Sequence, residues 1–204
     1  MATLQAKIDR LRGIDPYLID LSLRENPVGS RLGQTLDEKL AWLPRLRAFG
    51  FERILLGTLD YGYPELLEVD DDFMMHLRDT HADLTGCFAF TDGVIQPASG
   101  PFAPSPSMQK LRSYRVPNTL HEIYASEAGM RAAGYDLETL KRSLPASIAW
   151  LRQNVGAGEL FVNIVDGCDA FATNLEPTCE LLELLAAQPI TGLSFEDDRG
   201  TFLP

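Results

Sequence analysis

The stretch Tyr17-Leu18-Ile19-Asp20-Leu21-Ser22-Leu23-Arg24-Glu25-Asn26 runs from apolar residues into two adjacent, opposite charges. A period of two places Tyr17, Ile19, Leu21 and Leu23 on one face of a strand, and Leu18, Asp20, Ser22 and Arg24 on the other. Burying an arginine is costly unless its guanidinium meets an anionic partner. The pattern therefore predicts a strand whose apolar face packs against helices and whose polar face points into a central site.

Five more segments have the apolar character of buried strands, and helical patterns separate them. The strands are expected at 51–58, 84–90, 117–126, 159–166 and 190–195. A capping box at Thr35 opens a helix that ends at Gly50, Asp136 caps another, and a third covers 175–187. Asp70-Asp71-Asp72 is interpreted as the start of a helix, and 96–107 as a loop. Alternating strands and helices are typical of a parallel sheet.

The spacing of these strands points to a (β/α)8 barrel. Successive strands begin about 31 to 42 residues apart, and eight such units need roughly 250 residues. The 204 residues hold six units. We expect one α/β domain over residues 1–204, of TIM-barrel type with parallel strands, that lacks its last two units; a smaller closure or an open sheet are the alternatives. A nucleotide-binding open sheet is disfavoured because the sequence has no G-x-G-x-x-G or P-loop.

Composition restricts the partners. The formal net charge of −11 argues against nucleic acid and anionic membranes, whose phosphates would repel the chain. Cys87, Cys168 and Cys179 have no metal-type spacing, which predicts a reduced, cytoplasmic protein. No apolar run approaches the roughly 20 residues that span a bilayer. Six units would leave sheet edges unpaired, so either a homo-oligomer or a chain that covers its own edges is expected.

Residues 20–26 resemble the D-x-[TS]-L-R-D-G signature of the DRE-TIM metallolyases, the family of isopropylmalate, homocitrate and citramalate synthases and of hydroxymethylglutaryl-CoA lyase. Residues 190–204 look like the family's sixth strand, I-x-I-x-D-T-x-G-x-x-x-P, with Asp197, Gly200 and Pro204 on motif positions. The resemblance implies a TIM barrel that uses a divalent metal (Mg, Mn or Zn) to make or break carbon–carbon bonds of a 2-oxo acid or acyl-CoA.

In that family the arginine steadies an enolate and the following aspartate binds the metal, which implies a catalytic Arg24 and a metal ligand at Glu25. Three features depart from the pattern. Glu25 replaces the aspartate, Leu55 lies where the family's second strand has a glutamate, and the strand with H-x-H is absent. For Arg24 and Glu25, the alternative is a structural ion pair or a carboxylate that caps a helix.

Polar residues near the ends of the expected strands are the remaining candidates. Asp20 positions Arg24 or holds a substrate group, with a plain salt bridge as the alternative. Candidate substrate-binding residues are Thr58, Asp60, Glu122, Ser126, Asn163 and Asp197, and loop solvation is the alternative for the first five.

Two functions follow from this reading. The first is a lyase or acyltransferase of the aldol or Claisen type that acts on a small carboxylate or an acyl-CoA. The second is a non-catalytic, barrel-derived protein that uses the same cleft for binding or assembly, which Glu25, Leu55 and the absent H-x-H favour.

Overall fold

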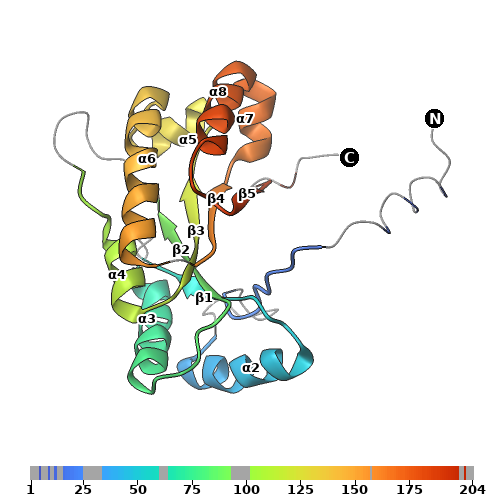
Figure 1. Cartoon of the computed structure of the whole chain (residues 1–204), viewed down its shortest axis with the longest axis vertical. Helices are drawn as coiled ribbons and strands as arrows, with labels where there is room; N and C mark the ends of the chain where they lie inside the picture. The colour runs from blue at the N-terminus through green and yellow to red at the C-terminus, as the bar shows by residue number, and fades with distance from the viewer. Residues whose placement is uncertain are drawn as a thin grey trace.

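The computed structural model describes residues 16–24, 34–59, 64–92, 102–156, 158–197 and 200, together with Gln5, Asp9 and Arg12; of residues 64–68 it describes the backbone alone. The strands are β1 (Ile54–Thr58), β2 (Cys87–Asp92), β3 (Asn118–Ile123), β4 (Leu160–Ile164) and β5 (Gly192–Phe195). The helices are α2 (Leu36–Phe49), α3 (Pro64–Asp79), α4 (Pro106–Tyr114), α5 (Glu127–Ala132), α6 (Leu137–Asn154), α7 (Gly167–Thr173) and α8 (Leu175–Ala186). Figure 1 shows them in place.

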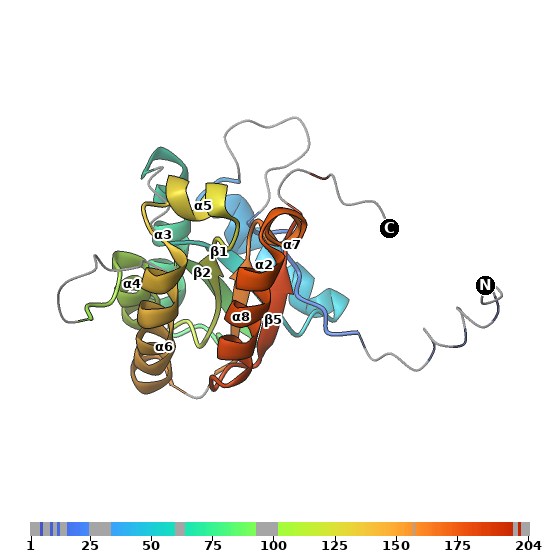
Figure 2. The ribbon, with the colours of Figure 1, turned by 90° about the horizontal axis from the view of Figure 1, so that it is seen from above.

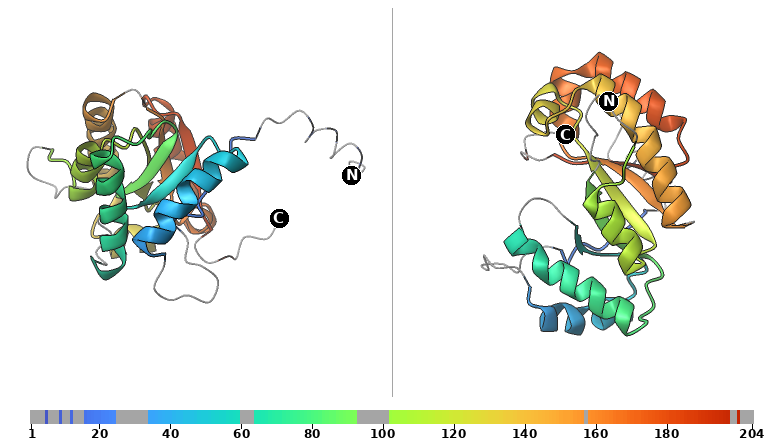
Figure 3. Two further views of the ribbon diagram at one scale, coloured as in Figure 1. Left: turned by 90° about the horizontal axis from the view of Figure 1, so that it is seen from below. Right: turned by 90° about the vertical axis from the view of Figure 1, so that its left-hand side faces the viewer.

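The five strands form one parallel sheet in the order β1-β2-β3-β4-β5. Each strand thus pairs with the next strand of the chain, which is the order found in a barrel. Helices α4, α6 and α8 follow one another around one side of the sheet (Figure 2), and the same layering is seen from below and from the side (Figure 3). The predicted α/β class with parallel strands is confirmed, and within the described residues the sheet ends at β5.

The first expected strand is much shorter than predicted. It contributes one parallel bridge, Asp20 to Ile54, beside β1. The Asp20 carboxylate accepts hydrogen bonds from the Ser22 amide (3.1 Å) and hydroxyl (3.0 Å), and the Arg24 amide donates to the Leu21 carbonyl. An aspartate that bonds two residues ahead favours a turn over a ladder, so residues 22–24 leave the strand direction.

The two faces of the sheet carry separate apolar clusters. The outer cluster joins strands to helices, and includes Ile54, Ala89 and Val162 of the strands and Ile148 of α6. The inner cluster is made of strand residues and one neighbour from the first segment: Ile19, Leu55, Phe88, Phe90, Leu120 and Phe161. Alternation along each strand assigns successive positions to one cluster and then the other.

This division corrects the predicted faces of residues 17–20. Ile19 packs in the inner cluster, and the Tyr17 ring lies 5.1 Å from the Phe161 ring. Asp20 shares the outer face with its bridge partner Ile54. The prediction exchanged the two faces of this segment. A period of two separates the faces but does not say which of them packs against the helices.

Helix α2 confirms the predicted capping box, with Thr35 and Glu38 bonding reciprocally, and it ends at Gly50 in the left-handed region. The prediction for Asp70-Asp71-Asp72 is wrong, because α3 begins at Pro64 and these aspartates lie in its middle. Helix α4 begins within the segment that was interpreted as a loop. Helices α5 and α7 were not predicted because both are short.

His121 on β3 is fully buried between the sheet and the helices, and its Nδ1 lies 2.9 Å from the Thr91 hydroxyl. Burial lowers its pKa to about 4, below the value of about 6.5 in an unfolded chain. Its contribution to stability is therefore complete above about pH 6.5 and is lost as the pH falls toward 4.

We expect the free energy of unfolding to fall by about 2 kcal/mol from this group between about pH 7.5 and about pH 5. Urea unfolding at the two pH values measures the change. His121→Leu should remove this component, while the exposed His76→Gln should keep it. An unchanged pH dependence in His121→Leu would contradict the assignment.

Candidate active site

A row of polar side chains crosses the inner face at the carboxyl ends of the strands. Asp92, Glu122 and Asn163 lie two residues after Phe90, Leu120 and Phe161 of the inner cluster, so alternation puts them on the same face. The sheet register pairs Asp92 with Glu122, and Glu122 with Asn163. Parallel strands thus bring three polar groups together directly above an apolar, largely aromatic layer.

Asn163 joins two carboxylates in this row. Its Nδ2 donates to Glu122 Oε1 (3.1 Å) and to Glu196 Oε1 (2.8 Å), and the residue is 1% exposed. Both partners are acceptors, so the nitrogen must face them. The Asn163 Oδ1 atom is buried and has no hydrogen-bond partner among the described residues.

The Asp92 carboxylate is held by the start of α4. Ser107 donates its hydroxyl to Asp92 Oδ1, and the Asp92 amide donates back to the Ser107 oxygen at 3.1 Å. Ser107 in turn lies 2.9 Å from Ser105, whose hydroxyl caps α4 by accepting from the Met108 amide. The turn that begins α4 therefore fixes the position of this carboxylate.

A bulge at the end of β1 turns Thr58 to the inner face. The register shifts between Leu55 and Thr58, and Thr58 pairs with Phe90 of the inner cluster. The Thr58 amide donates to Asp70 Oδ2 at 2.8 Å. Gly57 permits this contact, because a Cβ there would lie 2.3 Å from the same oxygen.

Arg24 reaches the same end of the inner face. Its side chain is exposed and its Cζ lies 5.3 Å from the centre of the Phe90 ring. A guanidinium over an aromatic face makes a favourable cation–π contact. The predicted inward position of Arg24 holds, although the turn at residues 22–24 produces it and not strand alternation.

Lys39 of α2 supports both Arg24 and Thr58 from the helix side. It is 3% exposed, pairs with Asp70 Oδ1 at 2.8 Å, and donates to the carbonyls of Leu23 and Leu56 (3.2 Å for Leu56). Burial raises the pKa of Asp70, and the neighbouring lysine opposes that rise. One buried ammonium thus links the residue before Arg24 to the strand that ends at Thr58.

The other predicted site residues lie elsewhere or outside the description. Asp20 lies on the outer face and bonds Ser22. Ser126 caps α5 by accepting from the Gly129 amide. Asp197 is half-buried, and its charge, after burial, helps raise the pKa of the Cys168 thiol in α7. Glu25 and Asp60 lie outside the described residues.

Sequence reasoning missed Asp92 and Glu196. Every second residue of a strand faces the same side, so Asp92 faces inward two residues after Phe90. Glu196 likewise follows Ser194 by two residues, and Ser194 pairs with Asn163. This signal was available, but the expected strands ended at residues 90 and 195, just before each carboxylate.

A cluster of aromatic and charged side chains lies at the amino ends of the strands. The Arg53 guanidinium lies 4.0 Å from the centre of the Tyr17 ring and its Nε lies 3.2 Å from Glu159 Oε2, while Tyr17 packs on Phe161. Two hollows of about 430 Å³ lie at this end, lined by Pro16–Leu18 with Gly50–Arg53, and by Ala82–Gly86 with Arg115, Pro117 and Asn118. Neither hollow brings together a set of groups comparable to the polar row.

The described part of the chain contains no group of side chains that matches the predicted metal site. No group of three or more histidine, cysteine, aspartate or glutamate residues there is arranged to hold an ion. In the same part of the chain, no helix is long and apolar enough to cross a membrane.

Comparisons with known proteins support the fold. Neither the models of protein families nor the curated protein sequences give a match. Among solved structures, an HMG-CoA lyase from Acinetobacter baumannii, in complex with coenzyme A and 3-methylmalate, is similar with a TM-score of 0.63 and 12% sequence identity. The match covers 91% of this chain and 57% of the lyase, so the chain spans little more than half of that protein's length. At this identity the likeness shows the fold alone.

Proposed function

We propose that the inner face carries an active site that makes or breaks carbon–carbon bonds next to a carbonyl, in an aldol or Claisen reaction of a 2-oxo acid or an acyl-CoA. The observation that carries the proposal is that Arg24 and several carboxylates share the carboxyl ends of the parallel strands. This is the end at which barrel enzymes hold their catalytic groups. The likeness to a lyase that binds coenzyme A and 3-methylmalate supports the substrate class.

The chemistry follows from the charges. A carboxylate, Glu122 in this scheme, takes a proton from the carbon beside the carbonyl, and the electron pair of that C–H bond moves onto the carbonyl oxygen. Arg24 stabilises the negative charge that develops there. The enolate then attacks a second carbonyl, or takes a proton back. Family resemblance adds a divalent metal at Glu25, which stays a prediction because that residue lies outside the described part.

Exchange of carbon-bound hydrogen with D2O tests this step without a second substrate. The protein, with Mg²⁺ or Mn²⁺ added, is incubated with pyruvate or acetyl-CoA, and deuterium at the methyl carbon is followed by mass spectrometry. We expect exchange above the protein-free rate. Glu122→Gln should lower it roughly 100-fold, as loss of a general base does.

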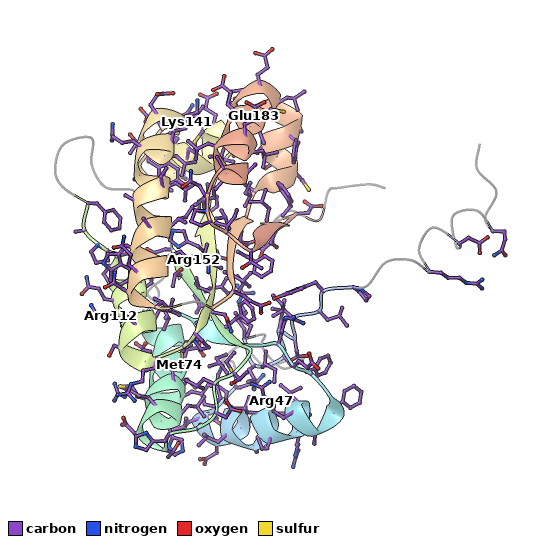
Figure 4. The ribbon with its side chains drawn as sticks, in the orientation of Figure 1. Arg47, Met74, Arg112, Lys141, Arg152 and Glu183 are labelled. Carbon is purple, nitrogen blue, oxygen red and sulfur yellow. The ribbon has the colours of Figure 1, made fainter. Side chains whose placement is uncertain are left out.

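Glu183→Gln is the matched control, because Glu183 is an exposed glutamate on α8, at the top of Figure 4. It should exchange at the wild-type rate. A wild-type protein that catalyses no exchange with either compound would refute the proposal.

One observation favours a non-catalytic binding or assembly role instead. Beyond β5 no further strand pairs within the described residues, and β5, α7 and α8 each carry an exposed large apolar side chain. Phe195 is 44% exposed and Phe171 39%, with their rings 5.6 Å apart, and Leu175 is 57% exposed. Failure of the exchange experiment together with self-association in solution would support this role.

A further inference from the structure

We propose that the exposed face of α2 is the contact surface of a dimer, in which the α2 helices of two copies of this chain pack against each other in antiparallel directions. The inference does not rest on the proposed reaction. Helix α2 lies on the helix side of the sheet and forms the lower edge of the molecule in Figure 1, whereas the proposed active site lies on the inner face.

Helix α2 packs on the protein with one face and leaves large apolar side chains on the other. Leu46 is buried in the outer cluster, and Leu40 and Leu43 pack against that cluster. On the exposed side of the helix, Trp42 is 46% exposed and Phe49 is 82% exposed. The helix of a soluble monomer is usually polar on the side that faces water. The second apolar face therefore indicates contact with another protein surface.

The apolar surface continues from α2 onto the segment beside β1. The Phe49 and Phe51 rings stack with their centres 5.5 Å apart, and Phe51 lines a hollow together with Leu18, which is 61% exposed. Residues 17–21 and α2 together hold five of the eight exposed large apolar side chains among the described residues. Such a concentration is typical of an interaction surface.

The exposed side of α2 has the spacing and the charges of a helix that pairs with itself. Glu38, Trp42, Arg45 and Phe49 follow one another at intervals of four, three and four residues, and all four are exposed. This is the spacing of a seam along which two helices pack. The acidic residues Asp37 and Glu38 lie in the first turn, so antiparallel helices bring the acids of one copy to Arg45 of the other.

Charge also favours a second copy at this surface over a second copy at the β5 edge. A symmetric contact places the same patch of both copies together, so a patch of one sign repels itself. Helix α2 has three basic and two acidic residues, a formal charge of +1 in a chain that carries −11. Helix α8, which carries the exposed Leu175 near β5, has three glutamates and no basic residue. Two copies that met there would repel each other.

Sedimentation velocity of the whole chain at concentrations from about 1 to about 100 µM tests the dimer. We expect a monomer–dimer equilibrium in the wild type. Phe49→Ser should raise the dissociation constant at least about tenfold, because aromatic anchors carry much of the binding free energy of an interface. Phe195→Ser is the matched control, since it changes an exposed phenylalanine of β5, and it should dimerise as the wild type does.

Charge reversal tests the antiparallel arrangement. Arg45→Glu should weaken the dimer at least about tenfold, because it places like charges opposite each other. Adding Asp37→Arg in the same chain should restore the dimer, since the pair is then reversed as a whole. A circular dichroism spectrum and a melting temperature close to those of the wild type establish that each variant folds.

Four results would overturn the inference. The first is a wild type that stays monomeric at the highest concentration. The second is a dimer that Phe195→Ser dissociates and Phe49→Ser does not, which would move the contact to the β5 edge. The others are an Arg45→Glu dimer as tight as the wild type and a double variant as weak as Arg45→Glu alone.

Discussion

Arg24→Ala is expected to slow enolate formation by roughly 100- to 1,000-fold, the usual cost of removing a group that stabilises a developing oxyanion. The side chain is exposed and lies over the Phe90 ring, so its loss should change the free energy of unfolding by less than about 1 kcal/mol. The activity loss can thus be separated from a loss of fold. Initial rates of deuterium exchange measure it.

Two further variants make this result specific. Arg24→Lys keeps the charge but not the planar, two-pronged donor, so an intermediate rate is expected. Arg112→Ala removes an exposed arginine on α4, away from the inner face (Figure 4), and should leave the rate unchanged. An Arg24→Ala protein that exchanges as fast as the wild type would remove Arg24 from the site.

Lys39→Met should have the largest effect on stability, about 3–5 kcal/mol, because it leaves the Asp70 carboxylate buried without its cation. It also leaves the carbonyls of Leu23 and Leu56 without this donor. Urea unfolding measures the change. Lys141→Met, which breaks a partly exposed pair with Glu180, should cost less than about 1 kcal/mol.

The pH dependence of this loss has a definite sign. Burial already raises the pKa of Asp70 above its ordinary value, and without Lys39 the pKa rises further. A proton neutralises the carboxyl once the pH falls below that pKa, so the defect of Lys39→Met should be smaller near pH 5 than near pH 8. A defect no larger than that of Lys141→Met, at either pH, would mean that the buried pair is unimportant for stability.

The parallel sheet and its sequential order could be predicted because each strand is a short apolar run with a helix after it. Capping chemistry also fixed α2, where Thr35, Glu38 and Gly50 behave as their types require. Asp70 was misread because a helix N-terminus favours acidic residues, and only the fold brings Lys39 from α2 to pair with it inside the protein.

The positions of some candidate residues follow from the sheet, while their roles stay predictions. Thr58, Glu122 and Asn163 lie near the carboxyl ends of β1, β3 and β4, and Arg24 lies over the Phe90 ring. The bulge at Thr58 and the turn after Asp20 could not be foreseen, because each depends on a hydrogen bond that competes with the ladder. The bridging of Glu122 and Glu196 by Asn163 depends on a register that a single sequence does not contain.

We propose that ligands bind at the carboxyl ends of the strands on the inner face. A titration with pyruvate, followed by backbone amide shifts, tests this proposal, because the residues at the two ends of the sheet give separate signals. We expect saturable shifts at Asp92, Asn163 and Ser194, with Gly86 and Asn118 unmoved. Shifts confined to Gly86 and Asn118, beside the hollow at the amino ends, would place the ligand at the opposite end of the sheet and rule out the proposed site.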